Sequence, residues 1–194
     1  MKKKISIKSM AAVALFCVLT IAAKAQVPTY ICEIRNAVLL SPSEYQFDIY
    51  LMRTGEAPFE FAGMQMGINF NNAVIPEGAL ITPTITGKYT VNACNSNKQI
   101  NIAIMGISAK GIRITIPVPT CGPGNGTIIS NVAPGNLVCQ VKLTSSIPFV
   151  PKTSFDFSWN FINAIPIKTR VFYYPAGAKG GGECTNPESH KIVK

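Results

Sequence analysis

Residues 45–52 read Tyr-Gln-Phe-Asp-Ile-Tyr-Leu-Met, and apolar side chains alternate with polar ones through most of this stretch. A β-strand has this period of two, because its successive side chains point to opposite faces of the sheet. The stretch therefore predicts a strand whose buried face carries Phe47 and Ile49 and whose exposed face carries Asp48 and Tyr50. A helix would need apolar residues three and four positions apart, and no segment of the sequence keeps that spacing over several turns.

The same alternation recurs in five more stretches, and three further strands, at about 30–40, 79–86 and 168–174, bring the expected number to nine. We expect strands at about 30–40, 64–70, 79–86, 100–104, 112–116, 137–143, 155–161 and 168–174. Residues that favour turns, such as the Gly-Pro-Gly of 122–124, separate them. This pattern predicts an all-β chain, a nine-stranded antiparallel sandwich whose two sheets pack their apolar faces together. On the stretch 155–161, Trp159 shares parity with three phenylalanines, which favours a place in the core.

The first 25 residues have the layout of a secretory signal peptide. Three lysines at positions 2–4 form a basic start, residues 10–23 form an apolar run too short to anchor in a bilayer, and Ala23-Lys24-Ala25 offers a cleavage site. We expect 1–25 to be signal peptide, 26–175 to be the folded domain, and 176–194 to be a Gly-rich linker or disordered tail. Export would place the mature chain in an oxidising compartment, with no stable membrane insertion after cleavage.

The net charge gives no support to a nucleic-acid partner. The whole sequence has a formal net charge of +9, but five of its 18 basic residues lie in the expected signal peptide. The mature chain would keep 13 Lys and Arg against nine Asp and Glu, which is a net charge of +4. Nucleic-acid binding needs a clustered basic face, and the remaining basic residues are scattered along the sequence. We therefore expect no nucleic-acid partner.

Five cysteines remain after the expected cleavage, which is an odd number for an exported protein. Cys94 and Cys121 lie in predicted loops that a disulfide between them would pin together, whereas Cys32 and Cys139 have the parity of core residues. A bridge from Cys184 to Cys32 or Cys121 also stays open, and it would tie the predicted tail to the domain.

No two cysteines are spaced as CxxC and the single histidine lies in the tail, so neither a zinc site nor a Ser-His-Asp triad is expected.

Two groups of strand and turn residues stand out together. The first is FDIYL at 47–51, TG at 54–55, PFEFAG at 58–63 and GINFN at 67–71, and the second is GNGTIIS at 124–130, PG at 134–135 and VKLT at 141–144. They resemble cohesin-like modules in secreted proteins of bacteria with type IX secretion, and the resemblance covers about residues 30–174. It implies a nine-stranded jelly-roll sandwich, related to cohesins and to some carbohydrate-binding modules, that binds or displays rather than catalyses.

The resemblance also has implications for the localisation of the protein. Proteins with such modules often continue into a C-terminal sorting domain, whereas here a glycine run and residues 183–194 follow the predicted sandwich. We therefore expect a secreted or cell-surface protein, or a periplasmic one if no sorting domain is present.

Nothing in the sequence brings a catalytic pair of carboxylates together. The predicted domain holds Asp48, Asp156 and five glutamates on separate strands and turns, where isolated carboxylates are usually solvated. Glycoside hydrolysis needs two carboxylates that face one another. Asn69, Asn71 and Asn72 could offer oxygen ligands to calcium, but no acidic residues accompany them. We expect no enzyme, no cofactor and no metal.

Three tyrosines are the candidate ligand-binding residues. Tyr50 on a polar strand face, Tyr89 in a loop and Tyr174 at the end of the last strand could each stack on a sugar ring. Asp48 or Asn160 would supply hydrogen bonds, although a tyrosine in such a place is more often a half-buried surface residue than a ligand platform. The expected function is a non-catalytic module that binds a polysaccharide or another secreted protein. The alternative is a structural cell-surface or matrix subunit that assembles through its strand edges.

Overall fold

The computed structural model describes residues 27–86, 90–91, 103–108, 111–117, 122–162, 167–176, 180–185 and 191–192. The expected signal peptide, Tyr89 and the pair Cys94 and Cys121 lie outside these residues. Within them the regular elements are strands and one short 3-10 turn, η1 (Asn72–Val74). None of the described residues forms a helix long and apolar enough to cross a membrane.

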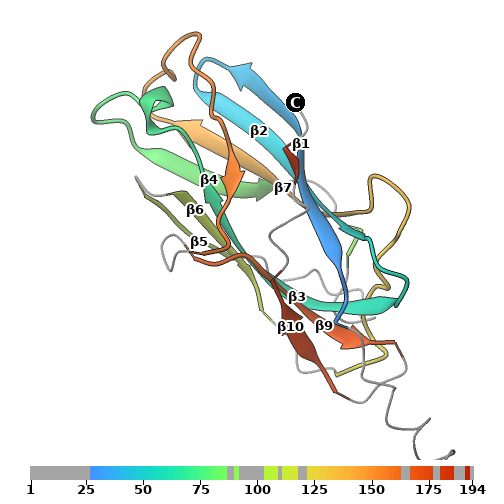
Figure 1. Cartoon of the computed structure of the whole chain (residues 1–194). Helices are drawn as coiled ribbons and strands as arrows, with labels where there is room; N and C mark the ends of the chain where they lie inside the picture. Colours follow the sequence, from blue (N-terminus) through green and yellow to red (C-terminus); the bar gives the residue numbers. More distant parts are fainter. Residues whose placement is uncertain are drawn as a thin grey trace, which may run out of the picture.

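The strands form two sheets that face one another (Figure 1). Sheet A has the order β11-β1-β2-β7-β4 and contains β1 (Tyr30–Ser41), β2 (Glu44–Arg53), β4 (Ile81–Thr86), β7 (Asn136–Ser145) and β11 (Lys191–Ile192). Sheet B has the order β10-β9-β3-β6-β5 and contains β3 (Phe59–Asn69), β5 (Ala103–Ser108), β6 (Gly111–Ile116), β9 (Arg170–Pro175) and β10 (Gly182–Cys184). A further short strand, β8 (Ser158–Trp159), pairs with β3. Neighbouring strands are antiparallel except β1 and β11, which are parallel.

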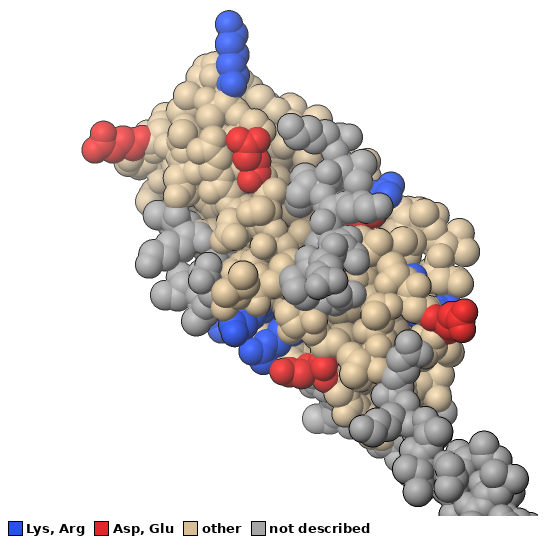
Figure 2. Space-filling model, viewed as in Figure 1, with Lys and Arg blue, Asp and Glu red and all other residues tan. Residues whose placement is uncertain are grey.

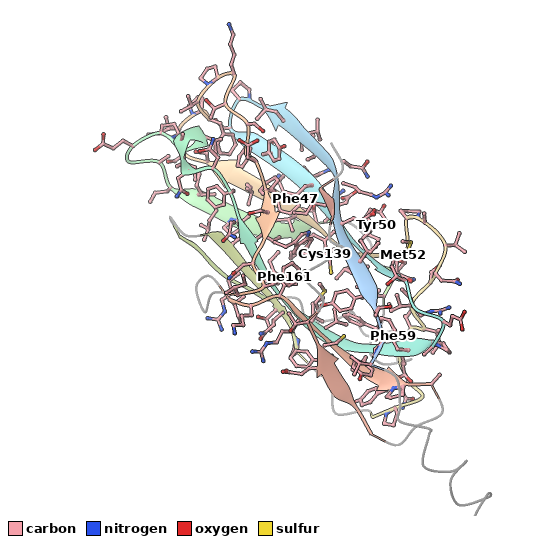
Figure 3. All side chains as sticks on the ribbon, in the orientation of Figure 1. Phe47, Tyr50, Met52, Phe59, Cys139 and Phe161 are labelled. Carbon is pink, nitrogen blue, oxygen red and sulfur yellow. The ribbon has the colours of Figure 1, made fainter. Side chains whose placement is uncertain are left out.

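Apolar side chains from both sheets meet in one core between them. Phe47 and Cys139 enter it from sheet A, and Figure 3 shows both between the two layers. Met66 and Ile114 enter it from sheet B, and all four are 0% exposed. The ring of Phe157 lies against Phe47, with 4.7 Å between the ring centroids. Burying each such side chain stabilises the fold by about 1.5–3 kcal/mol, so the alternation along the strands specifies the sandwich.

The all-β sandwich is confirmed, but the number of strands differs from nine. Each of the nine predicted stretches overlaps an observed strand, and the described residues hold eleven strands. The stretch 155–161 contributes only the two residues of β8, because Asp156 adopts a φ of 43°, which interrupts the extended backbone. Phe155 and Phe157 are nevertheless buried and Trp159 packs against the core, as their shared parity predicted.

The two additional strands lie in the region expected to be a linker or tail. β10 pairs with β9, and β11 pairs with β1. The expectation for 176–194 is therefore wrong at these residues, because β9 and β1 each offer a free edge with which a short segment can pair. The glycines of this region do not prevent pairing: a Cβ at Gly181 would come within 2.8 Å of the ring of Tyr174, so a residue without a side chain fits there.

Candidate functional site

Four polar side chains form a hydrogen-bonded row across the outer face of sheet A. Asn36 Nδ2 on β1 donates to Asp48 Oδ2 on β2 at 2.7 Å. Gln140 Nε2 on β7 donates to Asp48 Oδ1 at 2.8 Å, and Thr86 Oγ1 on β4 donates to Gln140 Oε1 at 3.0 Å. The strand register aligns them, because Asp48 pairs with Gln140 and Gln140 pairs with Thr86. We call Asn36, Asp48, Gln140 and Thr86 the polar row.

A bulge in β1 brings Asn36 into the row. The pairing of β1 with β2 shifts between Arg35 and Val38, and Asn36 sits in this shift with a φ of 52°. Asn tolerates the left-handed region better than most residues with a side chain. An extra residue in one strand re-aims its side chain, and here the amide of Asn36 reaches the carboxylate of Asp48.

Asp48 lies on the outer face, as the alternation predicted, but it is only 7% exposed. The expectation that isolated carboxylates are solvated is therefore wrong for Asp48, and also for Glu33 and Glu60, which are each 4% exposed. Each oxygen of Asp48 accepts a hydrogen bond from a side-chain amide. The carboxylate therefore fixes the orientation of Asn36 and Gln140, since buried polar groups must keep their partners.

Tyr50 lies beside the polar row, two residues beyond Asp48 on the same face of β2. The guanidinium carbon of Arg35 lies 6.0 Å from the centroid of its ring. Arg35 is itself held by Glu33, with 2.5 Å between Nε and Oε2. A cation at this distance interacts favourably with the ring and helps to fix its orientation. Tyr50 is half-buried, so part of its surface remains open to solvent.

An open hollow continues the same face beyond Tyr50. Its volume is about 550 Å³, and it is lined by Met52, Arg53, Thr54, Gly55, Glu56 and Asn131. Figure 3 shows Met52 next to Tyr50 at this end of β2. Arg53 Nη1 donates to the carbonyls of Gly55 and Glu56, which fixes the rim of the hollow. We call the polar row, Tyr50 and this hollow together the sheet A strip.

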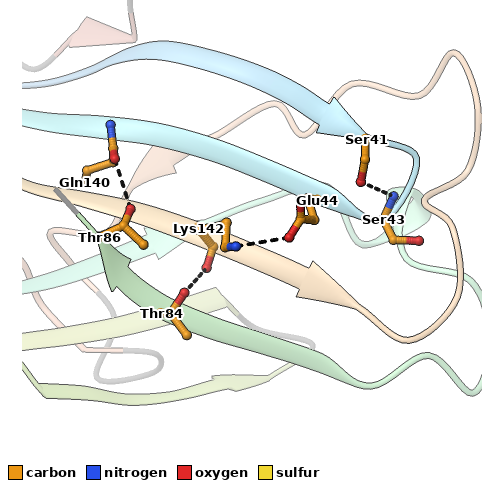
Figure 4. Close-up of polar contacts among 7 residues, drawn as sticks. All are labelled: Ser41, Ser43, Glu44, Thr84, Thr86, Gln140 and Lys142. Atoms are coloured by element: carbon orange, nitrogen blue, oxygen red, sulfur yellow. Dashed lines mark hydrogen bonds and ion pairs between the residues drawn. The ribbon is translucent and has the colours of Figure 1, made fainter.

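A second set of polar contacts extends the outer face toward the other end of β2 (Figure 4). Lys142 Nζ on β7 lies 3.0 Å from Glu44 Oε1 on β2. Thr84 Oγ1 on β4 donates to the carbonyl of Lys142 at 3.4 Å. The outer face of sheet A is thus polar along much of β2 and β7.

Two other predicted site residues belong to sheet B. Asn160 is 3% exposed, its Nδ2 donates to the carbonyl of Ile167 at 2.9 Å, and its backbone N–H donates to Gly67 at 2.8 Å. It therefore holds a connection of sheet B in place. Tyr174 lies on β9, paired with Glu60, and is half-buried. The structure brings Asp48 and Tyr50 together but places Asn160 and Tyr174 on the other sheet.

The outer face of β3, in the middle of sheet B, is covered by the chain itself. The carboxylate of Glu60 accepts backbone hydrogen bonds from Gly124 at 2.6 Å, from Asn125 at 2.9 Å and from Gly126. Further along β3, the carbonyl of Ile167 occupies the space that a Cβ at Gly67 would need. This strand offers its outer face to its own loops rather than to a ligand.

Charge is spread thinly over the face of the molecule that Figure 2 presents. Figure 2 shows basic and acidic side chains interspersed on the face it presents, with no broad patch of one sign. Among the described residues no three His, Cys, Asp or Glu side chains group as metal ligands would. The sheet A strip is therefore distinguished by fixed hydrogen-bonding groups and an aromatic ring rather than by its charge.

Sequence reasoning missed Arg35, Asn36, Gln140 and Thr86. Alternation placed Gln140 on a polar face, but the contacts depend on strand order and register, which alternation does not contain. Comparison of the chain with protein-family models and with curated proteins finds no match.

Proposed function

We propose that the chain is an exported, non-catalytic binding module that holds a polysaccharide along the sheet A strip. The observation that carries the proposal is the polar row, in which the carboxylate of Asp48 orients two amides beside the half-open ring of Tyr50. Groups held in place before binding lose little conformational entropy when a ligand arrives.

The chemistry of the strip suits sugars. Sugar hydroxyls both donate and accept hydrogen bonds, and the amides, the hydroxyl of Thr86 and the hollow beside Arg53 and Glu56 offer both kinds of group. The apolar face of a sugar ring can stack on an aromatic side chain, and Tyr50 supplies one next to the polar row. An extended chain of sugars would run along β2 from the polar row into the hollow.

The order of the strands supports the finer fold assignment, a jelly-roll of the cohesin-like kind. The chain crosses from one sheet to the other after β2, β3, β4, β6, β7 and β10, whereas β1–β2 and β5–β6 are neighbouring antiparallel strands within one sheet. Such repeated crossings are typical of Greek-key and jelly-roll sandwiches. Secretion or surface display is part of the same proposal and rests on the sequence of residues 1–25.

Retention on insoluble polysaccharides tests this function. The wild type and the variants Tyr50→Ala and Tyr174→Ala would be incubated with a panel of neutral and acidic polysaccharides, and the bound fraction would be measured. We expect Tyr50→Ala to weaken binding about 10-fold, which corresponds to roughly 1.4 kcal/mol, and Tyr174→Ala to bind as the wild type does. Failure of the wild type to bind any polysaccharide, or equal losses in both variants, would contradict the proposal.

One observation favours a structural subunit as the second candidate. Among the residues that the structure describes, β11 pairs with Glu33 and Ile34 of β1, and further along β1 the side chains of Val38, Leu39 and Leu40 are 45–52% exposed. An apolar edge strand of this kind can pair with another chain. Sedimentation velocity over a range of concentrations tests this candidate. Assembly that Leu39→Lys abolishes would support it, and a monomer at every concentration would exclude it.

A further inference from the structure

The end of the described chain passes from one sheet to the other. β10 lies at the edge of sheet B, and β11 pairs with β1 at the edge of sheet A. Only six residues separate the two strands in the sequence. Cys184, the last residue of β10, therefore stands where the chain leaves sheet B for β1.

Contacts across the interior place Cys184 near Cys32. The side chain of Tyr30 reaches from β1 to β10, where its hydroxyl donates to the carbonyl of Cys184 at 3.2 Å. Cys32 follows Tyr30 by two residues on the same inward face of β1, and both are 0% exposed. Cys184 is 6% exposed, and its thiol lies 3.8 Å from the carbonyl of Val171. Burial raises the pKa of the Cys32 thiol, and the proximity of Cys184 raises it further.

The third described cysteine cannot be the partner of Cys32. Cys32 pairs with Leu51 of β2, and Cys139 pairs with Ile49 on the opposite edge of the same strand. Two strand spacings, about 10 Å, therefore separate the backbones of Cys32 and Cys139. A disulfide needs Cα atoms about 4.4–6.8 Å apart. Among the described cysteines this leaves Cys184.

We propose that Cys32 and Cys184 form a disulfide that ties β1 of sheet A to β10 of sheet B and fastens the C-terminal strands to the sandwich. Each thiol gives up one proton, and together they give up two electrons to the disulfide of an oxidant. That oxidant is a small-molecule disulfide or the oxidised, disulfide form of a thiol–disulfide oxidoreductase, which takes up the two electrons and two protons and is reduced to two thiols. The bond does not depend on the proposed polysaccharide site.

Burial predicts when the bond forms. Thiol–disulfide exchange needs the thiolate, and burial followed by the charge of Glu183 raises the pKa of Cys184 to about 12. In the folded, reduced chain both thiols stay protonated at neutral pH, so exchange is slow. The disulfide should therefore form before β10 docks. Once formed, it should resist reduction until the C-terminal strands open.

Peptide mapping tests the bond on the full chain. The protein would be refolded in a mixture of oxidised and reduced glutathione, alkylated under denaturing conditions and digested with trypsin without reduction. We expect the peptide that ends at Arg35 to be linked to the peptide 180–191, and reduction to separate them. The control variant Cys139→Ala should keep the link. Alkylated Cys32 and Cys184 in unreduced protein, or a link from either to another cysteine, would overturn the proposal.

A stability measurement gives a second readout. The bond closes a loop of more than 150 residues, and in the chain-entropy account long loops gain most from closure. The oxidised wild type should melt roughly 10 °C or more above Cys184→Ser measured under the same conditions. Equal melting temperatures would show that the two cysteines do not staple the folded chain.

Discussion

The outer faces of the two sheets carry similar kinds of residue but use them differently. In sheet B, the carboxylate of Glu60 is satisfied by the backbone of residues 124–126, and Gly67 lies under the backbone of Ile167. In sheet A, the carboxylate of Asp48 is satisfied by the side-chain amides of Asn36 and Gln140, beside the half-open Tyr50. A carboxylate in sheet B thus holds a loop, whereas one in sheet A holds groups that can meet a ligand.

This difference separates stability from binding. Substitutions on the outer face of β3 should lower the free energy of unfolding, because they leave backbone hydrogen-bonding groups without partners or push neighbouring backbone segments apart. Substitutions on the sheet A strip should weaken ligand binding more than they lower the free energy of unfolding. The predictions below follow that division, from the largest expected effect on stability to the smallest.

Gly67→Ala should have the largest effect. The new Cβ would overlap the carbonyl oxygen of Ile167, which is backbone and cannot rotate away. We expect a loss of about 3 kcal/mol in the free energy of unfolding, measured by urea denaturation. Gly180→Ala is the matched control, since nothing lies within 4 Å of a Cβ there, and it should stay within about 0.5 kcal/mol of the wild type. Similar losses in both variants would mean that β3 is not covered as described.

Glu60→Gln should have an intermediate effect. One carboxylate oxygen would become an NH₂ group facing a backbone N–H, so at least one buried donor loses its acceptor. We expect a loss of about 2 kcal/mol. On sheet A, Glu44→Gln removes the partly exposed pair with Lys142 and should cost at most about 0.5 kcal/mol. A larger loss for Glu44→Gln than for Glu60→Gln in urea denaturation would contradict the claim that the carboxylate of sheet B contributes more to stability.

The pH dependence of stability probes the inner side of sheet A. Burial, followed by the charge of Asp48, raises the pKa of the Cys139 thiol far above its ordinary value. In the unfolded chain this thiol ionises above about pH 8.5, whereas in the fold it stays protonated. The burial of this protonated thiol therefore contributes fully to the free energy of unfolding below that pH. As the pH rises further, the contribution falls by up to about 1.4 kcal/mol per pH unit.

Urea denaturation of the reduced chain between pH 8 and 10 measures this slope. Cys139→Ala should show a shallower fall than the wild type, whatever its stability at pH 8. Cys32 and Cys184 titrate in both proteins, so they do not affect the difference. Parallel slopes would show that Cys139 is not buried beneath the polar row.

The sequence predicted the layers of the fold better than it predicted the candidate site. Alternation identified the strand faces, because burial of Phe47 or Ile114 depends only on the period of two. It also placed Asp48 and Tyr50 together on one outer face, since they are two residues apart on one strand. The polar row needs Gln140 and Thr86 from distant strands, and their register comes from tertiary pairing. The bulge at Asn36 has no signal in the alternation.

The C-terminal strands show the same limit of prediction from sequence, because here the structure contains strands that the sequence did not predict. Composition favoured a linker over 176–194, because a glycine run has little apolar surface to bury. The pairing of β10 and β11 depends on the free edges of β9 and β1, and those edges exist only after the sheets have formed. Within this segment, Cys184 was the residue that suggested attachment to the domain, through a disulfide, and its side chain is buried in the structure.

The most direct test of the central claim is to map the binding face by NMR. The ¹⁵N-labelled protein would be titrated with soluble oligosaccharides of the neutral and acidic polysaccharides in the retention panel. If the sheet A strip is the ligand surface, the backbone amides of β1, β2 and β7 around Asp48 and Tyr50 should shift in a saturable way, while those of β3, β6 and β9 stay in place. Shifts confined to sheet B, or no saturable shift with any oligosaccharide, would contradict the account.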